Sequence, residues 1–349
     1  MPQESIPTPE IVSGDDEVPR SIYTKLKSFG VNIDEIKNIE SIYPMKVTEH
    51  YASLITSPND PIYRQSIPTI DELMDEENIE DPLEEENHTP VEYLVHKYPD
   101  RCLLLVSNEC SMICRFCTRK RKVGKTDQIP MDKIFEAIKY IKEHTEIRDV
   151  IISGGDPLLR TDQELNAILM VLRTIPHVEI IRIGTRMPCV QPSRITPELV
   201  EILKKYHPLY MNIHFNHPKE LTDRTIQACN MLSNAGIVLG AQTVLLKGVN
   251  DTPSVMKELM QKLIKNRIQP RYLYNCDLVK GTNHFRTDLQ LGKTIIKYIN
   301  ESTSGLCTPN YVIDSAIGKV PVDSDHVSHI GDNEYTLKFN GKSCQYFDK

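Results

Sequence analysis

The stretch CLLLVSNECSMICRFCTRKRK, residues 102–122, joins an apolar run to three closely spaced cysteines and a block of cations. Its first six residues have the continuous apolar character of a buried strand. Cys110, Cys114 and Cys117 then fall within eight positions, and four Lys or Arg residues follow at 119–122. Thiolates bind soft metals, and Arg or Lys side chains bind anionic groups. The stretch therefore predicts a loop after a strand that binds a metal and an anion.

Outward from this loop, apolar runs alternate with amphipathic segments that have the spacing of helices. Continuous apolar strands alternating with helices predict a parallel sheet covered on its faces. Six such units fit either a partial or complete β/α barrel or an open doubly wound sheet. A tail after residue 309 has the pattern of one or two more strands. The six apolar runs are 102–107, 149–153, 179–185, 209–215, 237–246 and 271–276.

In both architectures, ligands bind at the carboxyl ends of the strands. Polar residues directly after the apolar runs are therefore candidate site residues. The cysteine loop occupies this place after the first run. The other candidates are Ser153–Asp156, Thr185 with Arg186, His214–His217, Gln242, and Cys276 with Asp277.

The whole chain has 349 residues, which is enough for one large α/β domain with an extension. Its net charge of −7 gives no electrostatic reason to expect nucleic-acid binding. The sequence has no signal peptide and no run that could span a bilayer, so we expect a cytoplasmic protein with reduced thiols. The odd count of nine cysteines then favours a metal site over disulfides. We expect the acidic stretch at 71–87 to be a solvated surface segment.

The cysteine cluster leaves two kinds of metal site to consider. Structural zinc usually takes four ligands as two separated pairs, and no second pair follows here. A cubane iron–sulfur cluster is held by thiolates at short spacings, and three of them would leave the fourth iron open to a substrate or cofactor. A partial zinc site is the alternative. His214 and His217 form a less favoured metal pair, because no carboxylate triad lies near them in the sequence.

The Cys-x3-Cys-x2-Cys spacing after the first strand resembles the radical S-adenosylmethionine (SAM) superfamily. The resemblance implies that the three cysteines hold a [4Fe–4S] cluster whose open iron binds SAM. One electron from the cluster then cleaves SAM to a 5′-deoxyadenosyl radical. The resemblance also implies that the SGGDP stretch binds SAM through Gly154, Gly155 and Asp156.

Longer motifs, in family order, are similar to those of the lysine 2,3-aminomutase family over about residues 60–325. They include KYPDRCLLLVSNECSMICRFCTRKR, ISGGDPL, RIGTRMP, HFNHP, QTVLLKGVND and YLYNCDLVKGTNHFRT. This resemblance implies a PLP-dependent isomerase with a partial (β/α)6 barrel of the TIM type at residues 95–303. A helical extension at 1–94 would precede the barrel, and a short segment at 304–349 would carry the lysine that binds pyridoxal phosphate (PLP).

The family resemblance also implies roles for individual residues. The PLP lysine, which is the catalytic residue, matches Lys319 in VIDSAIGKVPV, where the glycine run is shorter than in the family. Two aspartates would repel the side chain of glutamate, so they favour a cationic substrate. The implied roles are Lys97 and Arg101 for the PLP phosphate, Arg119 for the substrate carboxylate, Asp277 and Asp314 for a distal ammonium, and Arg186, His214 and Gln242 around the cofactors.

The expected reaction is the conversion of free L-lysine to β-lysine. The alternatives are a protein-bound lysine of elongation factor P, arginine or another cationic amino acid, and a non-catalytic metal-binding module. Expected partners are the amino acid, a flavodoxin- or ferredoxin-type electron donor and a second copy of the chain, but neither nucleic acid nor a membrane. Cys344 stands alone at the end of the sequence, so we expect no structural zinc site there.

Overall fold

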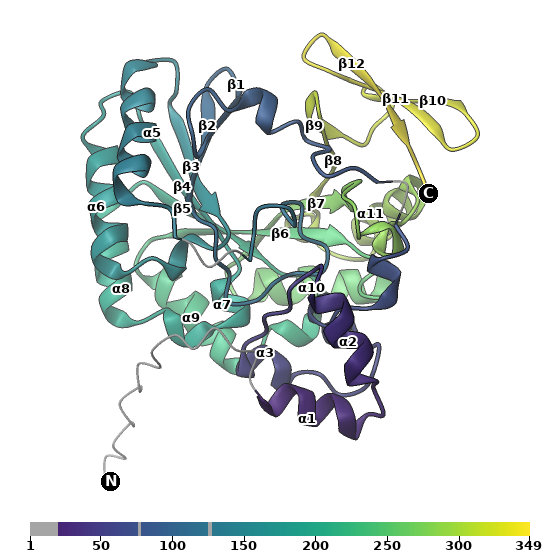
Figure 1. Cartoon of the computed structure of the whole chain (residues 1–349). Helices are drawn as coiled ribbons and strands as arrows, with labels where there is room; N and C mark the ends of the chain where they lie inside the picture. Colours follow the sequence, from purple (N-terminus) through teal and green to yellow (C-terminus); the bar gives the residue numbers. More distant parts are fainter. Residues whose placement is uncertain (1–19, 76–77, 125–127) are drawn as a thin grey trace, which may run out of the picture.

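The computed structural model describes residues 20–75, 78–124 and 128–349, and a nine-stranded sheet forms its centre (Figure 1). The strands lie side by side in chain order, from β1 to β9. Strands β2 to β8 are parallel, and β1 and β9 pair antiparallel at the two edges. Their bounds are β1 Leu94–Tyr98, β2 Arg101–Ser107, β3 Asp149–Gly154, β4 Ile180–Thr185, β5 Leu209–His214, β6 Val238–Leu245, β7 Gln269–Asn275, β8 Asn310–Ser315 and β9 Gly318–Pro321.

Helices connect the parallel strands because each presents an apolar stripe to the sheet. In α5 the buried residues Ile134, Ala137, Ile138 and Ile141 recur at the spacing of one helix face. Thr161 and Glu164 form a capping box that begins α6. The helices between the strands are α5 Met131–Glu143, α6 Asp162–Arg173, α7 Met187–Val190, α8 Pro197–Leu203, α9 Asp223–Asn234, α10 Pro253–Lys265 and α11 Leu289–Ser302.

The predicted partial β/α barrel is confirmed. A doubly wound sheet reverses its strand order at a switch point, whereas this order never reverses. Strand β8 adds a seventh parallel strand to the six predicted units. The edge strands β1 and β9 are not paired with each other in the described sheet, so the barrel is open. Side chains of β1 bridge the opening instead: the Tyr98 hydroxyl accepts from Lys319 N on β9 at 2.9 Å, and Lys97 Nζ donates to Ser315 O at the end of β8 at 2.5 Å.

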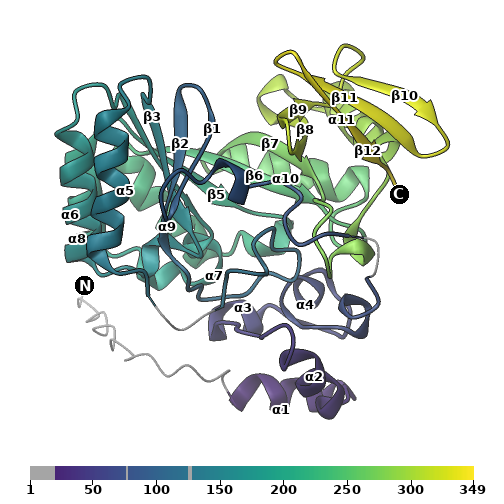
Figure 2. The same ribbon diagram turned by 45° about the horizontal axis from the view of Figure 1, so that its top comes forward.

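In the described residues, four short α-helices precede the barrel, and α3 among them contacts α7 (Figure 2). Ile22, Tyr51 and Ile62 from this region belong to the same apolar core as the barrel. The region also holds the cysteine loop, because Ile113 N donates to Lys46 O at 2.9 Å and Arg115 N donates to Gln65 O at 3.0 Å. The helices are α1 Arg20–Ser28, α2 Ile33–Glu40, α3 Glu49–Ser53 and α4 Pro61–Ser66.

Much of the described acidic stretch at 71–87 is exposed as predicted, but the prediction of a solvated segment is wrong for three of its carboxylates, Glu72, Asp75 and Glu85, which are buried. Glu72 is 1% exposed and Glu85 is 5% exposed. Glu72 accepts from Arg115 at 2.6 Å and from Lys120 at 2.6 Å, and Arg115 is itself fully buried. A charge run has the same composition whether it meets water or buried cations, and the cations that pair with Glu72 lie 43 and 48 residues further along the chain.

A three-stranded antiparallel sheet ends the chain, with strands β10 Val327–Gly331, β11 Glu334–Phe339 and β12 Lys342–Phe347. It is fixed to the barrel by Asn275 on β7, which donates to the Tyr346 hydroxyl at 2.7 Å and accepts from the Tyr311 hydroxyl at 3.0 Å. In the part of the chain that the structure describes, no helix is long and apolar enough to cross a membrane.

Candidate active site

The three cysteines lie in the loop between β2 and α5, at the carboxyl end of the first parallel strand. All three are half-buried. Burial and the neighbouring Cys114 raise the pKa of Cys117 to about 11, and burial with Cys117 raises that of Cys110. Because ionisation of Cys110 and Cys117 is disfavoured without a cation, these thiols are suited to a cationic centre that stabilises thiolates. Within the described ranges, no three His, Cys, Asp or Glu side chains converge on a single ion. A four-iron cluster does not require such convergence, because each thiolate binds a different iron.

Gly154 and Gly155 press the end of β3 against the start of the cysteine loop. A Cβ on Gly154 would lie 2.2 Å from Ser107 O, and Gly154 has a φ of +128°. A Cβ on Gly155 would lie 2.1 Å from Glu109 O. The Gly155 N–H also donates to Ser107 O at 2.6 Å. The two predicted SAM-binding glycines thus shape the loop, and this Gly155 N–H is already paired.

Asp156 joins the ends of β3 and β4. Its carboxylate accepts from the Thr185 hydroxyl at 2.7 Å, from Arg186 N at 2.8 Å and from Leu158 N at 3.0 Å. Burial raises the pKa of Asp156, although these hydrogen bonds oppose that effect. The sequence predicts a cofactor role for Asp156, and the structure places its carboxylate in contact with the protein's own backbone and hydroxyl donors.

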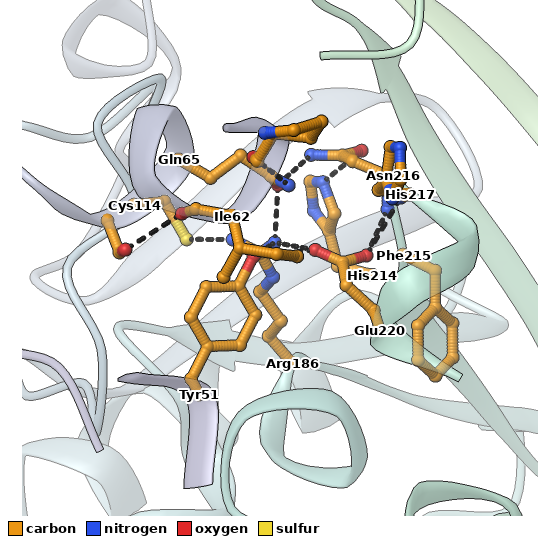
Figure 3. Close-up of polar contacts among 12 residues, drawn as sticks. Tyr51, Ile62, Gln65, Cys114, Arg186, His214, Phe215, Asn216, His217 and Glu220 are labelled. Carbon is orange, nitrogen blue, oxygen red and sulfur yellow. Dashed lines mark hydrogen bonds and ion pairs between the residues drawn. The ribbon is translucent and has the colours of Figure 1, made fainter. Parts of the chain in front are cut away.

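Arg186 stands at the end of β4 and reaches the cysteine loop (Figure 3). Its Nη1 donates to Cys114 Sγ at 2.9 Å. Its Nη2 donates to Glu220 Oε1 at 2.8 Å, to Gln65 Oε1 at 2.7 Å and to the Tyr51 hydroxyl at 3.1 Å. Sequence reasoning predicted Arg186 but missed its three partners, which come from the N-terminal helices and from the turn after β5.

His214 and Gln242 are neighbours in register on β5 and β6. Burial and nearby Arg186 lower the pKa of His214 to about 3, so its imidazole is neutral, and it is hydrogen-bonded to Asn216 Oδ1 at 3.0 Å. Gln242 is half-buried. His217 Nδ1 accepts from Lys219 N and caps a short turn. His214 and Gln242 therefore lie next to each other, which is compatible with the prediction that both contact a cofactor. His217 instead caps a turn.

Lys319 on β9 lies in an aromatic pocket. Its Nζ donates to the Tyr274 hydroxyl at 2.5 Å and lies 4.6 Å and 4.5 Å from the ring centroids of Tyr272 and Tyr274. Burial lowers the pKa of Lys319, but Tyr274 and Asp314 outweigh burial and raise it above its ordinary value. A single amine among stacking rings fits the aldehyde and planar ring of PLP. The two tyrosines alternate along β7, a spacing that puts both on one face of the strand.

The two cations predicted for the PLP phosphate, Lys97 and Arg101, come from β1 and β2. Lys97 donates to Ser315 O and to Leu83 O at 3.0 Å, and burial lowers its pKa. Arg101 pairs with Asp100 at 2.9 Å, and its guanidinium lies 3.8 Å from the ring centroid of Tyr98. The Tyr98 hydroxyl in turn accepts from Lys319 N. Both cations are therefore near Lys319, and both are already bonded to protein groups.

Asp277 and Asp314 meet at the carboxyl ends of β7 and β8. The Thr118 hydroxyl donates to Asp277 Oδ2 at 2.6 Å, whereas Asp277 Oδ1 is buried and has no hydrogen-bond partner among the described residues. Burial and the nearby Asp314 raise the pKa of Asp277 to about 7. Asp314 also lies opposite Lys319 in the β8–β9 hairpin. The site thus contains two half-buried carboxylates and one buried oxygen without a partner, which fits a cationic ligand.

The four cations after the cysteines pair mainly with the acidic stretch. Arg119 Nε donates to Glu85 Oε2 at 3.0 Å and Arg119 Nη2 donates to Glu85 Oε1 at 2.5 Å. Arg121 pairs with Asp81 at 2.9 Å. We predicted that these cations bind anions of the cofactors and substrate, but most of them form ion pairs within the protein. A substrate carboxylate would meet Arg119 with one edge of its guanidinium already bound.

Comparisons with known proteins identify the family to which the chain is similar. Residues 104–263 match the model of the radical SAM superfamily. The L-lysine 2,3-aminomutase of Clostridium subterminale is 50% identical over 86% of this chain and 74% of its own length. The glutamate 2,3-aminomutase of Clostridioides difficile is 41% identical over 90% of this chain and 76% of its own. The structure of Streptococcus suis SuiB bound to the precursor peptide SuiA is 19% identical, with a TM-score of 0.49 over 64% of this chain and 50% of that one.

The family match covers the cysteine loop and the strands from β3 to β6, and the match to the C. subterminale relative covers 86% of the chain. They bring with them a [4Fe–4S] cluster, SAM and PLP as the cofactors. The three thiols, the strand-end polar groups and the buried lysine described above fit these three groups. The chain therefore belongs to the lysine 2,3-aminomutase family, a family of isomerases within the radical SAM superfamily.

Proposed function

We propose that this chain moves the α-amino group of free L-lysine to the β-carbon and so forms β-lysine. The observation that carries the proposal is the carboxylate pair, because buried Asp277 Oδ1 lacks a partner in the described structure and Asp314 lies beside it. A buried carboxylate oxygen without a hydrogen-bond partner is costly, and a ligand ammonium removes that cost. The relative from C. subterminale carries the name L-lysine 2,3-aminomutase, which supports the same substrate.

The pair also separates lysine from the other candidate amino acids. Glutamate would bring a third carboxylate to the pair, which makes the activity named for the C. difficile relative a poor fit to this pocket. Arginine binds carboxylates best through two parallel N–H donors to two free oxygens. Asp277 offers one free oxygen, because Thr118 already donates to the other. A single ammonium donor suits this arrangement better than a guanidinium fork.

The chain's own residues would divide the work as follows. Cys110, Cys114 and Cys117 hold the cluster, and His214 with Gln242 contact SAM. Lys319 binds PLP, and the Tyr274 hydroxyl can exchange a proton with its Nζ. When bound, the cluster with SAM supplies a carbon radical, and PLP supplies the π system through which nitrogen moves.

Charged groups at the two ends of the pocket would orient the amino acid. Arg119 binds its α-carboxylate while Glu85 holds the guanidinium in place. Asp277 and Asp314 bind the distal ammonium. Because the two ends carry opposite charge, only one orientation of lysine satisfies both. A flavodoxin- or ferredoxin-type protein supplies the electron, and the enzyme works as a homo-oligomer in this proposal.

The test is an anaerobic assay of reconstituted enzyme with SAM, PLP, a reductant and equal amounts of lysine, arginine, ornithine and glutamate. We expect a β-lysine peak after chromatography, and none from the Lys319→Ala variant, which should also lose bound PLP. A β-product from another amino acid would keep the mechanism and overturn the substrate. SAM cleavage without any β-amino acid would instead indicate a protein-bound lysine, for which elongation factor P is the substrate to test.

A further inference from the structure

The contact between Arg186 and Cys114 gives the protein a direct influence on the iron–sulfur cluster. We propose that Arg186 raises the cluster's reduction potential by donating a hydrogen bond to the Cys114 sulfur. The carboxylate of Glu220 positions Arg186 for this contact. The inference rests on the proposed ligation of the cluster by Cys114, and it assigns functions to residues that the proposed reaction does not use.

The hydrogen bond has the geometry of a strong one. The distance from Arg186 Nη1 to Cys114 Sγ is 2.9 Å, and Arg186 is 7% exposed. A guanidinium in so dry a place keeps its charge, because arginine does not lose its proton in proteins. Hydrogen bonds to the sulfurs and local charge set the potential of a cluster. A cationic donor stabilises the reduced cluster more than the oxidised one, since the reduced cluster carries one more negative charge.

The arginine is held so that it cannot turn away from the sulfur. Glu220 is fully buried, and its Oε1 accepts from Arg186 Nη2 at 2.8 Å and from the Tyr51 hydroxyl at 2.7 Å. Its Oε2 accepts from the backbone N–H groups of Asn216 at 2.6 Å and His217 at 3.0 Å. Both carboxylate oxygens are therefore fixed by the protein, as Figure 3 shows.

The arrangement also orients charge toward the cluster. The positive guanidinium lies next to Cys114, and the negative carboxylate of Glu220 lies behind it, on the side away from the sulfur (Figure 3). The ion pair has no net charge, but its positive end faces the cluster. Burying such a pair costs free energy of desolvation, so a contribution to stability alone is a weak reason for its presence.

The redox step itself is simple. One electron passes from a low-potential donor to the oxidised [4Fe–4S]2+ cluster and gives [4Fe–4S]1+, and no proton or bond changes on Arg186. By raising the potential, Arg186 lets a given donor reduce a larger fraction of the clusters before SAM is cleaved.

The experiment is a redox titration of anaerobically reconstituted protein without SAM, followed by electron paramagnetic resonance of the reduced cluster. The variants are Arg186→Gln and the double variant Arg186→Gln with Glu220→Gln, which leaves no buried charge uncompensated. The matched control is Arg182→Gln, because Arg182 is also on β4 but pairs with Asp149 at 2.8 Å, away from the cysteines. Iron and sulfide are measured first in each protein and in Cys114→Ala.

We expect full iron in both Arg186 variants and a lower midpoint potential than in the wild type and the control. For Arg186→Gln the ratio of reduced to oxidised cluster should fall about tenfold at a fixed solution potential, which is about 59 mV for one electron. Unchanged potentials with full iron would overturn the inference. Weaker SAM binding at an unchanged potential would do the same and make Arg186 a SAM ligand. Loss of the cluster from both variants would reduce Arg186 to a structural support.

The ligation on which the inference rests is tested separately. Wild-type protein that takes up no four-iron cluster, or a Cys114→Ala variant that keeps the full iron content, would refute the ligation before any potential is measured.

Discussion

Replacing Asp277 with Asn should weaken substrate binding and stabilise the substrate-free enzyme at the same time. Asp277 is a buried carboxylate whose pKa is raised to about 7 by burial and by Asp314. Between about pH 4 and pH 7 the folded protein therefore binds a proton that the unfolded chain does not. Its free energy of unfolding falls as the pH rises through this window. Asn has no charge to bury, so the free energy of unfolding of the variant does not fall in this way as the pH rises.

The size of both effects follows from the site. A shift from 3.8 to about 7 corresponds to about 4 kcal/mol at most, and relaxation around the pair makes a gain of about 2 kcal/mol at pH 8 the reasonable expectation. The lost charged hydrogen bond to the substrate ammonium is worth about 1.5–3 kcal/mol, so lysine should bind about 10- to 150-fold more weakly.

Two assays check this prediction. Urea unfolding of the substrate-free protein at pH 5 and pH 8 measures the stability difference, which should favour the variant at both values and more strongly at pH 8, because pH 5 lies in the lower part of the window. Lysine saturation of the reaction measures binding. Asp332→Asn is the control, since Asp332 is exposed on the turn after β10. A variant that is less stable than wild type at pH 8, or one that binds lysine equally well, would refute the reasoning about the carboxylate pair.

Three further changes test other parts of the site. Glu72→Gln removes the anionic partner of fully buried Arg115 and should cost about 3–5 kcal/mol of unfolding free energy at pH 7. Burial raises the pKa of Glu72, but Arg115 and Lys120 outweigh burial and lower it. The stability that this ion pair gives the wild type is therefore complete above the ordinary pKa of 4.5 and is lost as the pH falls through the lower pKa of the folded state. Unfolding measured between pH 3 and pH 7 checks this. Thr118→Val removes the hydrogen bond to Asp277 Oδ2 and so leaves both oxygens of Asp277 free for a guanidinium. We expect the ratio of arginine to lysine turnover to rise about tenfold in a competition assay. An unchanged ratio would contradict the proposed selectivity. Gly155→Ala places a Cβ 2.1 Å from the backbone oxygen of Glu109, so it should lower the iron bound per chain. Circular dichroism should show that the fold is retained. The control Gly305→Ala, whose Cβ meets no atom within 4 Å, should bind iron normally.

Hydrophobic pattern was enough to predict the six strand–helix units and the place of the cysteine loop. We placed β8 only in the tail, because β8 is not followed by a helix, as the strand of a β/α unit is. Its own pattern of buried residues, five of six at least half-buried, is that of the earlier strands. Local signals of this kind report which residues are buried, but the neighbours of a strand depend on the whole sheet.

Charge contacts could not be predicted in the same way. Glu85 and Arg119 are 34 residues apart, and Tyr51 and Glu220 are 169 apart, so no short motif joins them. The sequence indicated that four cations follow the cysteines, and electrostatics alone could not decide whether their partners were ligands or the chain's own carboxylates. Only the pair of tyrosines around Lys319 had a usable signal, since residues two apart on a strand share a face.

These contacts explain why an acidic chain presents so many cations beside its active site. Arg119 and Lys120 are neutralised by Glu85 and Glu72, which belong to the segment before the barrel. The carboxylate oxygen at the strand ends that has no hydrogen-bond partner in the described structure is Oδ1 of Asp277, and Asp314 lies opposite Lys319. An unpartnered carboxylate oxygen beside cations that are already paired favours a cationic side chain over an anionic one. The preference for lysine over glutamate thus depends on residues 72 and 85 as much as on the two aspartates that contact the substrate.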